Sequence, residues 1–197
     1  MRRLAIAVTI VCAAASAAQA ASNWEIDPAH TSAHFAVKHL MVSTVRGTMG
    51  AITGTAVLDA ADITKSSVQA TIDVAGIDTR EPKRDAHLKG PDFFDVAKFP
   101  TITFKSKTVK PVAADKFTIT GDLTIRGVTK EVTLDVDGTP TPLNDPFGKV
   151  RIGGSARTRI NRQDFGVNFS KTMDNGGLVV GNDVDVTIDI ELVKTGQ

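Results

Sequence analysis

The chain has very little cysteine, tyrosine or tryptophan. Of its 197 residues, one is cysteine, one is tryptophan and none is tyrosine. Cys12 lies in an apolar stretch near the amino terminus, so the rest of the chain offers no disulfide, no cysteine nucleophile and no thiolate metal ligand. With Trp24 as the single tryptophan, a sugar-stacking site or a recognition surface of aromatic anchors is disfavoured. The nine phenylalanines carry almost all of the aromatic surface, which favours an apolar ligand.

An excess of charge of either sign is also absent. The chain carries 23 Lys and Arg residues against 22 Asp and Glu residues. Loss of residues 1–20, which contain Arg2 and Arg3, leaves 21 against 22. A balance so close to zero provides no general attraction to nucleic acid or to an anionic membrane surface. We therefore expect no nucleic-acid partner, and we expect any contact with a membrane to be transient.

Long apolar runs are confined to the amino terminus. Two arginines precede an apolar run over residues 4–15, and Ala18-Gln19-Ala20 has the small-x-small pattern after which signal peptidase cleaves. A run of about a dozen residues is too short to span a bilayer, which takes about 20. The pattern predicts a cleaved signal peptide over residues 1–20, export to the periplasm and a mature chain that begins at Ala21.

The residues around Cys12 disfavour a lipoprotein. Thr9-Ile10-Val11 is a poor match to the sequence that precedes a lipid-modified cysteine. No linker, internal repeat or low-complexity stretch divides the remainder of the chain. We therefore expect a single domain over residues 21–197.

Apolar and polar residues alternate with period two through most of the chain after Trp24. Such clean alternation is typical of antiparallel strands with one dry face and one wet face. It predicts about eight strands, over residues 30–38, 47–59, 66–77, 101–110, 116–125, 129–138, 149–162 and 182–194. Several exceed ten residues, and long strands with a single dry face close most simply into a barrel. The prediction is an all-β, antiparallel β-barrel.

One segment, residues 79–100, interrupts the alternation. Thr79 or Asp78 could cap a short helix with Pro82 in its first turn, and Gly90 followed by proline would end it. Asp92 could then cap a single further turn. We predict one or two short helices near residues 81–96, lying across the barrel.

Phenylalanines are the most prominent candidates for a site. They could simply fill the barrel core, or they could line a dry cavity for an apolar ligand. The other inward positions are rich in Val, Ile, Ala and Gly, which favours an unfilled interior. The residues expected to line or gate the cavity are Phe35, Val37, Phe93, Phe94, Phe99, Ile102, Phe104, Phe165 and Phe169. Phe93 and Phe94 are the expected moving gate.

Histidines and a cluster of charged residues are the polar candidates. Two histidines four residues apart on one strand face could, with a third, bind zinc or copper. No acidic residue or cysteine stands beside them at ligand spacing, so no metal site is predicted. The charged residues at 80–89 could hold an anionic head group, or they could be a solvated helix face. The head-group candidates are His30, His34, Arg84 and His87.

No catalytic motif is recognisable in the sequence. A nucleophile elbow, a phosphate loop and recessed paired carboxylates are all missing. We therefore predict no catalytic residue and no cofactor, and we do not expect an enzyme. Two alternatives stay open: an enzyme that acts on a lipid-like molecule through a histidine or metal site, and a structural barrel whose interior is filled.

Five stretches together resemble the YceI-like proteins, in the same order along the chain. Any one of them is weakly specific, and together they cover essentially all of the chain after the amino-terminal segment. They are Trp24-Glu25-Ile26-Asp27-Pro28-Ala29-His30-Thr31-Ser32 with Phe35-Ala36-Val37-Lys38-His39-Leu40, Arg84-Asp85-Ala86-His87-Leu88 with Asp92-Phe93-Phe94-Asp95-Val96 and Lys98-Phe99-Pro100-Thr101-Ile102-Thr103-Phe104, Gly121-Asp122-Leu123-Thr124-Ile125-Arg126-Gly127-Val128-Thr129-Lys130, Arg162-Gln163-Asp164-Phe165-Gly166-Val167, and Val180-Gly181-Asn182-Asp183-Val184.

The resemblance implies an extended, lipocalin-like antiparallel barrel with an elongated apolar pocket. It also implies an exported protein that binds a polyisoprenoid-type lipid, an isoprenoid quinone or another long amphiphile. The function suggested is therefore to sequester or carry such a lipid. No catalytic residue transfers from the family. The expected partner is the isoprenoid-type lipid, and the expected assembly is a monomer or a homodimer.

Overall fold

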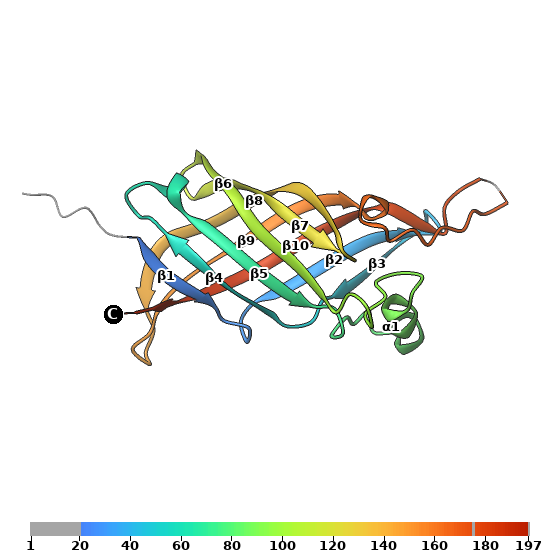
Figure 1. Ribbon diagram of the computed structural model, residues 1–197, viewed down its shortest axis with the longest axis horizontal. Coiled ribbons are helices and arrows are strands. Elements are labelled where there is room, and N and C mark those ends of the chain that lie inside the picture. Colours follow the sequence, from blue (N-terminus) through green and yellow to red (C-terminus); the bar gives the residue numbers. More distant parts are fainter. Residues whose placement is uncertain (1–20, 175, 197) are drawn as a thin grey trace, which may run out of the picture.

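The alternating segments form ten strands in the computed structural model, which describes residues 21–174 and 176–196 (Figure 1). In chain order they are β1 (Ser22–Ile26), β2 (Ser32–His39), β3 (Ser43–Thr48), β4 (Ile52–Leu58), β5 (Ser67–Asp73), β6 (Thr101–Ala113), β7 (Lys116–Ile125), β8 (Val128–Asn144), β9 (Val150–Asn161) and β10 (Val180–Thr195). One α-helix, α1 (Pro82–Lys89), and two 3-10 helices, η1 (Ile63–Lys65) and η2 (Arg162–Phe165), complete the described elements.

The amino-terminal prediction is not tested by this structure. The predicted signal peptide, residues 1–20, lies outside the described residues, as does Cys12. In the part of the chain that the structure describes, no helix has the length and apolar character needed to cross a membrane.

Eight of the strands close into an antiparallel barrel. The order around the ring is β1-β4-β5-β6-β7-β8-β9-β10, and β1 pairs back with β10. Along one edge β10 pairs with β9; along the other it pairs first with β2 and then with β1. The β2–β3 pair extends the sheet at the end of the elongated barrel that also carries α1 (Figure 1). The predicted all-β, lipocalin-like barrel is confirmed.

Two of the strands, β1 and β3, were not predicted. β1 is short and presents only two deeply buried side chains, Trp24 and Ile26, too few for the alternation to be visible. The predicted strand 47–59 joined the last residues of β3 to the whole of β4. The chain instead changes partners at residues 49–51, where the N–H of Met49 bonds Ala33 O and the N–H of Gly50 bonds Asp73 O. The strand therefore leaves β2 and joins β5, a change that no local pattern encodes.

Gly54 shows why glycine occurs inside a strand here. Its φ is 154°, which L side chains rarely adopt, and it lies opposite Ala70 on β5. A Cβ atom at Gly54 would sit 2.1 Å from Gln69 O, closer than any real contact. The residue therefore permits a close approach of β4 to β5 and the curvature that closure of the barrel needs.

The interruption of the barrel contains one helix, α1, where one or two were predicted. Its N-cap is Glu81, whose side chain accepts a hydrogen bond from Lys83 N, so the predicted caps Thr79 and Asp78 are wrong by two or three residues. The helix ends at Gly90, as predicted. Residues 91–94 form turns without a second helix.

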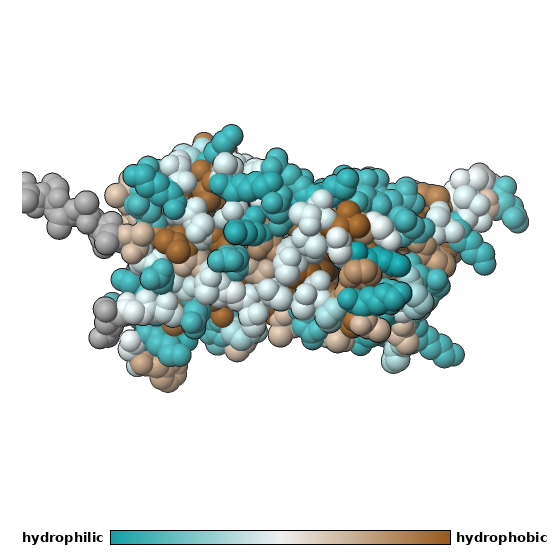
Figure 2. All heavy atoms as spheres, viewed as in Figure 1, coloured by the Kyte–Doolittle hydropathy of each residue, from teal (hydrophilic) through white to brown (hydrophobic). Residues whose placement is uncertain are grey.

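The buried side chains form two clusters along the barrel. One lies around β1, β4 and the paired part of β10, and consists of Trp24, Ile26, Ala33, Ile52, Ala56, Ile152 and Leu192. The other lies beneath the α1 end, and consists of Val74, Phe93, Ile102, Ile125, Phe165 and Val167. Met49 and Ile72 pack against both clusters. The outer faces of the strands carry polar residues, and the face seen in Figure 2 is mostly hydrophilic.

Candidate functional site

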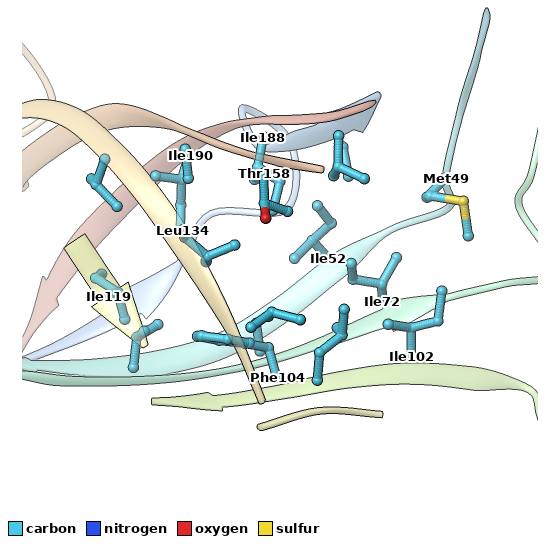
Figure 3. A pocket seen from close by; sticks show the side chains of 18 of the residues that line it. Met49, Ile52, Ile72, Ile102, Phe104, Ile119, Leu134, Thr158, Ile188 and Ile190 are labelled. Atoms are coloured by element: carbon cyan, nitrogen blue, oxygen red, sulfur yellow. The ribbon is translucent and has the colours of Figure 1, made fainter. Parts of the chain in front are cut away.

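The barrel encloses an interior cavity of about 320 Å³. Strands all around the ring contribute to its wall, and Figure 3 shows side chains such as Ile72, Ile119 and Leu134 directed toward a common space. Nearly all of the wall is apolar. The polar residues among those that line it are His34, Ser66, Ser67, Thr158 and Arg162.

Small inward residues leave this space open. The residues that line the wall include several alanines and glycines: Ala33, Ala56, Ala70, Gly138, Gly153, Gly154 and Ala156. An eight-stranded ring is just wide enough to be filled by larger side chains, so small ones leave room for a ligand. The structure therefore decides between the two interpretations of the phenylalanines in favour of an unfilled interior.

The α1 end of the cavity is covered by the α1 segment, which we define as residues 78–100. Leu88, Phe93 and Phe94 of this segment line the cavity. Phe93 stacks on Phe169, with 4.9 Å between the ring centroids. The His87 ring stands edge-on to both, at 5.0 and 5.2 Å. An aromatic cluster therefore closes this end of the barrel.

Polar bonds hold the α1 segment in place. Asp85 Oδ1 accepts hydrogen bonds from Thr79 N, at 2.9 Å, and from Thr79 Oγ1, at 2.5 Å. Arg84 donates from Nε to Thr79 Oγ1 and from Nη2 to Thr79 O, at 2.7 and 2.9 Å. On the opposite side, Arg126 Nη1 in the β7–β8 turn donates to Phe93 O. The bonds among Thr79, Arg84 and Asp85 thus brace the α1 segment internally, and the bond from Arg126 ties it to the barrel.

Arg162, at the start of η2, brings a buried cation to the cavity wall. Only 6% of the residue is exposed. Its Nε donates to Gly181 O at 2.9 Å, and its Nη1 donates to Val167 O at 2.5 Å. Its Nη2 donates to Val180 O at 3.2 Å and to Asn182 Oδ1 at 3.3 Å. Burial lowers the pKa of Arg162 from its ordinary value, because removal from water disfavours the charged form.

Seven of the predicted lining residues lie in the cavity wall: Phe35, Val37, Phe93, Phe94, Ile102, Phe104 and Phe165. The other two, Phe99 and Phe169, are not among the residues that line it, and this part of the prediction is corrected. The Phe99 ring lies over Gly127, where a Cβ would come within 2.8 Å of it. Phe169 packs behind Phe93 and so lies one layer outside the cavity.

Each of the four predicted head-group residues makes a polar contact with another side chain of the protein. His34 borders the cavity, but its side chain is exposed, and its Nε2 lies 3.0 Å from Ser32 Oγ. Arg84 is engaged with Thr79, as described above. His87 Nε2 lies 2.9 Å from Asp92 Oδ2, outside the cavity lining.

His30 belongs to a charged cluster at the base of β1. Its Nδ1 lies 2.9 Å from Asp27 Oδ2, and one ligand atom each of Asp27, His30 and Glu191 lie within 4.8 Å of one another. Arg151 already neutralises this group: its Nη1 donates to Asp27 Oδ2 at 2.7 Å and also to Glu191. Its Nε donates to Asp145 at 2.6 Å. The Arg151 guanidinium therefore supplies the positive charge that a metal cation would otherwise bring to these carboxylates. The cluster links the end of β1 to β9 and β10.

These charges reinforce each other. Hydrogen bonds from Arg151, first, and His30 lower the pKa of Asp27 well below its ordinary value. The hydrogen bond from Arg151 is also the main cause that lowers the pKa of Asp145. The pKa of Arg151 rises in turn, chiefly through Asp145 and then Asp27. The arrangement is that of an ion-pair network that ties strands together.

Sequence reasoning did not select Arg162, although a signal for it was present. Within the predicted strand 149–162, Arg162 shares the even-numbered face with Ile152, Ala156 and Ile160, which all line the cavity. Arg157 and Arg159, on the odd-numbered face, are exposed. The alternation therefore separates Arg162 from its two neighbouring arginines.

One protein family matches this chain over almost all of the described residues, and individual known proteins match most of it. The YceI-like domain matches residues 24–192. A UPF0312 protein of Staphylococcus aureus (strain N315) is 37% identical over 163 residues, which cover 83% of this chain and 92% of that protein.

Solved structures with the same barrel are also found. BcnA of Burkholderia cenocepacia matches with a TM-score of 0.71 at 25% identity, covering 84% of this chain and 98% of that chain. A polyisoprenoid binding domain from Saccharophagus degradans, implicated in plant cell wall breakdown, matches with a TM-score of 0.62 at 12% identity. That match covers 87% of this chain and 98% of the other, and it shows a shared fold.

Proposed function

The chain belongs to the YceI-like family, and on that premise we propose that it binds a long apolar amphiphile inside the barrel. A polyisoprenoid or an isoprenoid quinone is the ligand class that we favour. The observation that carries the proposal is the interior cavity, whose wall is apolar apart from five residues. The description of the Saccharophagus degradans fold neighbour as a polyisoprenoid binding domain supports the same ligand class.

Physical chemistry favours a ligand of this kind in such a cavity. Burial of one methylene group is worth about 0.8 kcal/mol, so one five-carbon isoprene unit contributes about 4 kcal/mol when it leaves water. The cavity volume of about 320 Å³ falls at the lower end of the range for small-molecule sites, about 300–1,000 Å³. The alanines and glycines of the wall provide the space, and the valines and isoleucines provide the contact surface.

We further propose that the protein sequesters or carries this lipid in the periplasm. The basic, apolar and small-x-small pattern of residues 1–20 supports export. A long apolar tail is poorly soluble in water, so an aqueous compartment between two membranes is a setting in which a closed apolar container is useful. Cell fractionation tests the location, and the mass of the purified protein tests cleavage after Ala20.

The direct test of binding is native mass spectrometry of the mature protein, purified without detergent, followed by organic extraction and identification of the lipid. We expect a one-to-one adduct with an isoprenoid or a similar long amphiphile. The proposal fails if the protein has its bare mass and also takes up neither added geranylgeraniol nor an apolar fluorescent dye.

A further inference from the structure

The tip of the β2–β3 hairpin holds apolar residues in an unfavourable backbone conformation. Leu40 and Met41 have positive φ, 51° and 59°, and the N–H of Val42 bonds His39 O at 3.1 Å. Positive φ at both central residues is the mark of a type I′ turn, in which Asn and Gly are strongly preferred. Leu and Met are sterically disfavoured there, because they carry a Cβ atom. The folding of the hairpin by itself therefore does not account for these residues.

The same residues present apolar surface to water. Met41 is 56% exposed and Val42 is 83% exposed. Single exposed apolar residues are ordinary, whereas adjacent ones at a projecting tip form one continuous apolar surface. Such a surface is typical of a contact with a membrane or with another protein.

The hairpin tip stands at the end of the barrel where the cavity is covered. Phe35 and Val37 of β2 line the cavity, and the strand continues from there to the tip. The N–H of Leu40 bonds Val179 O at 2.9 Å, which joins the tip to the segment before β10. Figure 1 shows the β2–β3 pair and α1 at the same end of the elongated barrel. A ligand that passes the α1 segment therefore leaves the cavity close to the hairpin tip.

The charges around the tip favour an anionic surface. Residues 38–46 include two cations, Lys38 and Arg46, which are both exposed, and no carboxylate. Cationic and acidic residues are equal in number in the α1 segment and also in residues 170–179, so the hairpin carries the local excess. Apolar side chains with cations beside them are the usual composition of segments that bind at a membrane interface.

We propose that the β2–β3 tip docks the α1 end of the barrel on an anionic lipid bilayer. Met41 and Val42 enter the headgroup region, and Lys38 and Arg46 lie beside the lipid phosphates. This inference rests on the function proposed above and specifies where the lipid enters and leaves. A long apolar tail is poorly soluble in water. Contact with the bilayer lets the tail move between two apolar environments without crossing water.

A second copy of the chain is a poorer occupant of this surface. A stable protein interface takes about 20–30 residues from each partner, far more than a hairpin tip provides. Insertion at a bilayer surface needs only a few apolar side chains, and its strength grows with the apolar area buried and with the attraction to anionic lipid. The small size of the tip thus fits a transient contact with a membrane.

The direct test places a fluorophore at each end of the barrel. The mature protein proposed above contains no cysteine, so a single introduced cysteine is labelled selectively. Val42→Cys and Phe147→Cys form a matched pair, because the native side chains are 83% and 87% exposed. Phe147 belongs to the β8–β9 turn, at the end of the barrel away from α1 (Figure 1). General stickiness predicts at least as large a response at position 147.

Each variant carries a nitrobenzoxadiazole label, whose emission rises and moves to the blue when it leaves water. The probe is a vesicle of equal parts phosphatidylcholine and phosphatidylglycerol, with no cargo. We expect vesicles to shift the emission of the label at position 42 and to leave the label at position 147 unchanged. High salt, or vesicles of phosphatidylcholine alone, should reduce the shift, because both weaken the attraction to Lys38 and Arg46.

A second experiment tests the role of the tip in lipid transfer. Met41→Gly/Val42→Ser removes the exposed apolar side chains and places glycine at a positive φ, so the urea midpoint should stay close to that of wild type. Transfer of an apolar fluorescent dye from the same vesicles should slow at least about fivefold. The affinity for the dye should change by less than about twofold, since neither residue lines the cavity. Phe147→Ser is the control and should transfer dye at the wild-type rate.

The outcomes distinguish this inference from the function on which it rests. Docking is overturned if the label at position 42 does not respond to vesicles, or if both labels respond equally. It is also overturned if that label responds to rising protein concentration without vesicles, which would assign the tip to a second copy of the chain. Wild-type transfer by the folded double variant would remove the tip from lipid exchange. A response at position 42 in a protein that takes up no dye would support docking and refute the proposed function.

Discussion

A phenyl ring placed inside the barrel should abolish binding of an apolar tail without unfolding the protein. Ala156 lines the cavity, is 7% exposed, and lies between Val136 on β8 and Ile188 on β10. Ala156→Phe brings six further carbon atoms into a cavity of about 320 Å³. They displace about six carbon atoms of the ligand tail, worth about 5 kcal/mol of burial, or more than three orders of magnitude in affinity. A tail that shifts within the cavity recovers part of this, so we expect a loss of at least about tenfold.

The free energy of unfolding of Ala156→Phe tests independently whether the barrel interior is vacant or packed. A ring that enters vacant space should change the free energy of unfolding by about 1 kcal/mol or less, whereas overpacking a filled core costs about 1–3 kcal/mol. Arg157→Phe is the matched control, because Arg157 is the next residue on β9 and is exposed on the outer face.

The assay is titration with an apolar fluorescent dye and with geranylgeraniol, together with urea unfolding of each protein. Loss of binding in Ala156→Phe, with binding intact in Arg157→Phe, is the expected result. The reasoning is refuted if folded Ala156→Phe binds as wild type does. A large loss of stability in Ala156→Phe would instead show that the interior is packed.

Three further predictions concern the parts that shape the barrel. Gly54→Ala should lower the free energy of unfolding by about 3 kcal/mol, because a Cβ would lie 2.1 Å from Gln69 O; Gly148→Ala, which has no neighbour within 4 Å, should cost about 1 kcal/mol in the same urea titration. Arg151→Met should lower stability most above about pH 5, and its difference from wild type should narrow as the pH falls below the ordinary aspartate pKa of about 3.9. The sign follows because Arg151 lowers the pKa of Asp27 and Asp145 in the folded state, so their stabilisation is lost on acidification; a constant difference across pH 2 to 7 would contradict it. Arg126→Ala removes the bond to Phe93 O and should speed dye release, measured by stopped flow, several-fold; an unchanged rate would show that this bond does not restrain the cover.

Local patterns predicted much of the fold because alternation is visible wherever a strand is long. The predicted strand 116–125 coincides with β7, and the predicted strand 182–194 falls within β10. Pro82 and Gly90 similarly marked the ends of α1, since their backbone preferences are local. The division of β3 from β4 was missed, because it depends on pairing with other strands. β3 pairs with β2, whereas β4 pairs with β5.

On the strands, the alternation of apolar and polar residues predicted the cavity wall directly. Phe35, Ile102 and Phe104 follow the alternation and line the cavity. Phe99 and Phe169 lie in irregular segments, where the direction of a side chain depends on what packs against it. Phe99 covers Gly127, and Phe169 stacks behind Phe93, and neither contact has a signature in the neighbouring sequence.

The sequence by itself determined that this chain forms an antiparallel barrel with one dry face, because the period of two is a property of the extended backbone and of each residue's neighbours. Tertiary structure alone decided that the dry face encloses a cavity, since that depends on how small residues from distant strands face one another. It also decided the state of Arg162. The alternation along residues 149–162 places that side chain on the inward face. The carbonyls of Val180 and Gly181 that accept its hydrogen bonds come from a strand about 18 residues later in the chain. A buried cation without a counter-charge exists only once those segments meet.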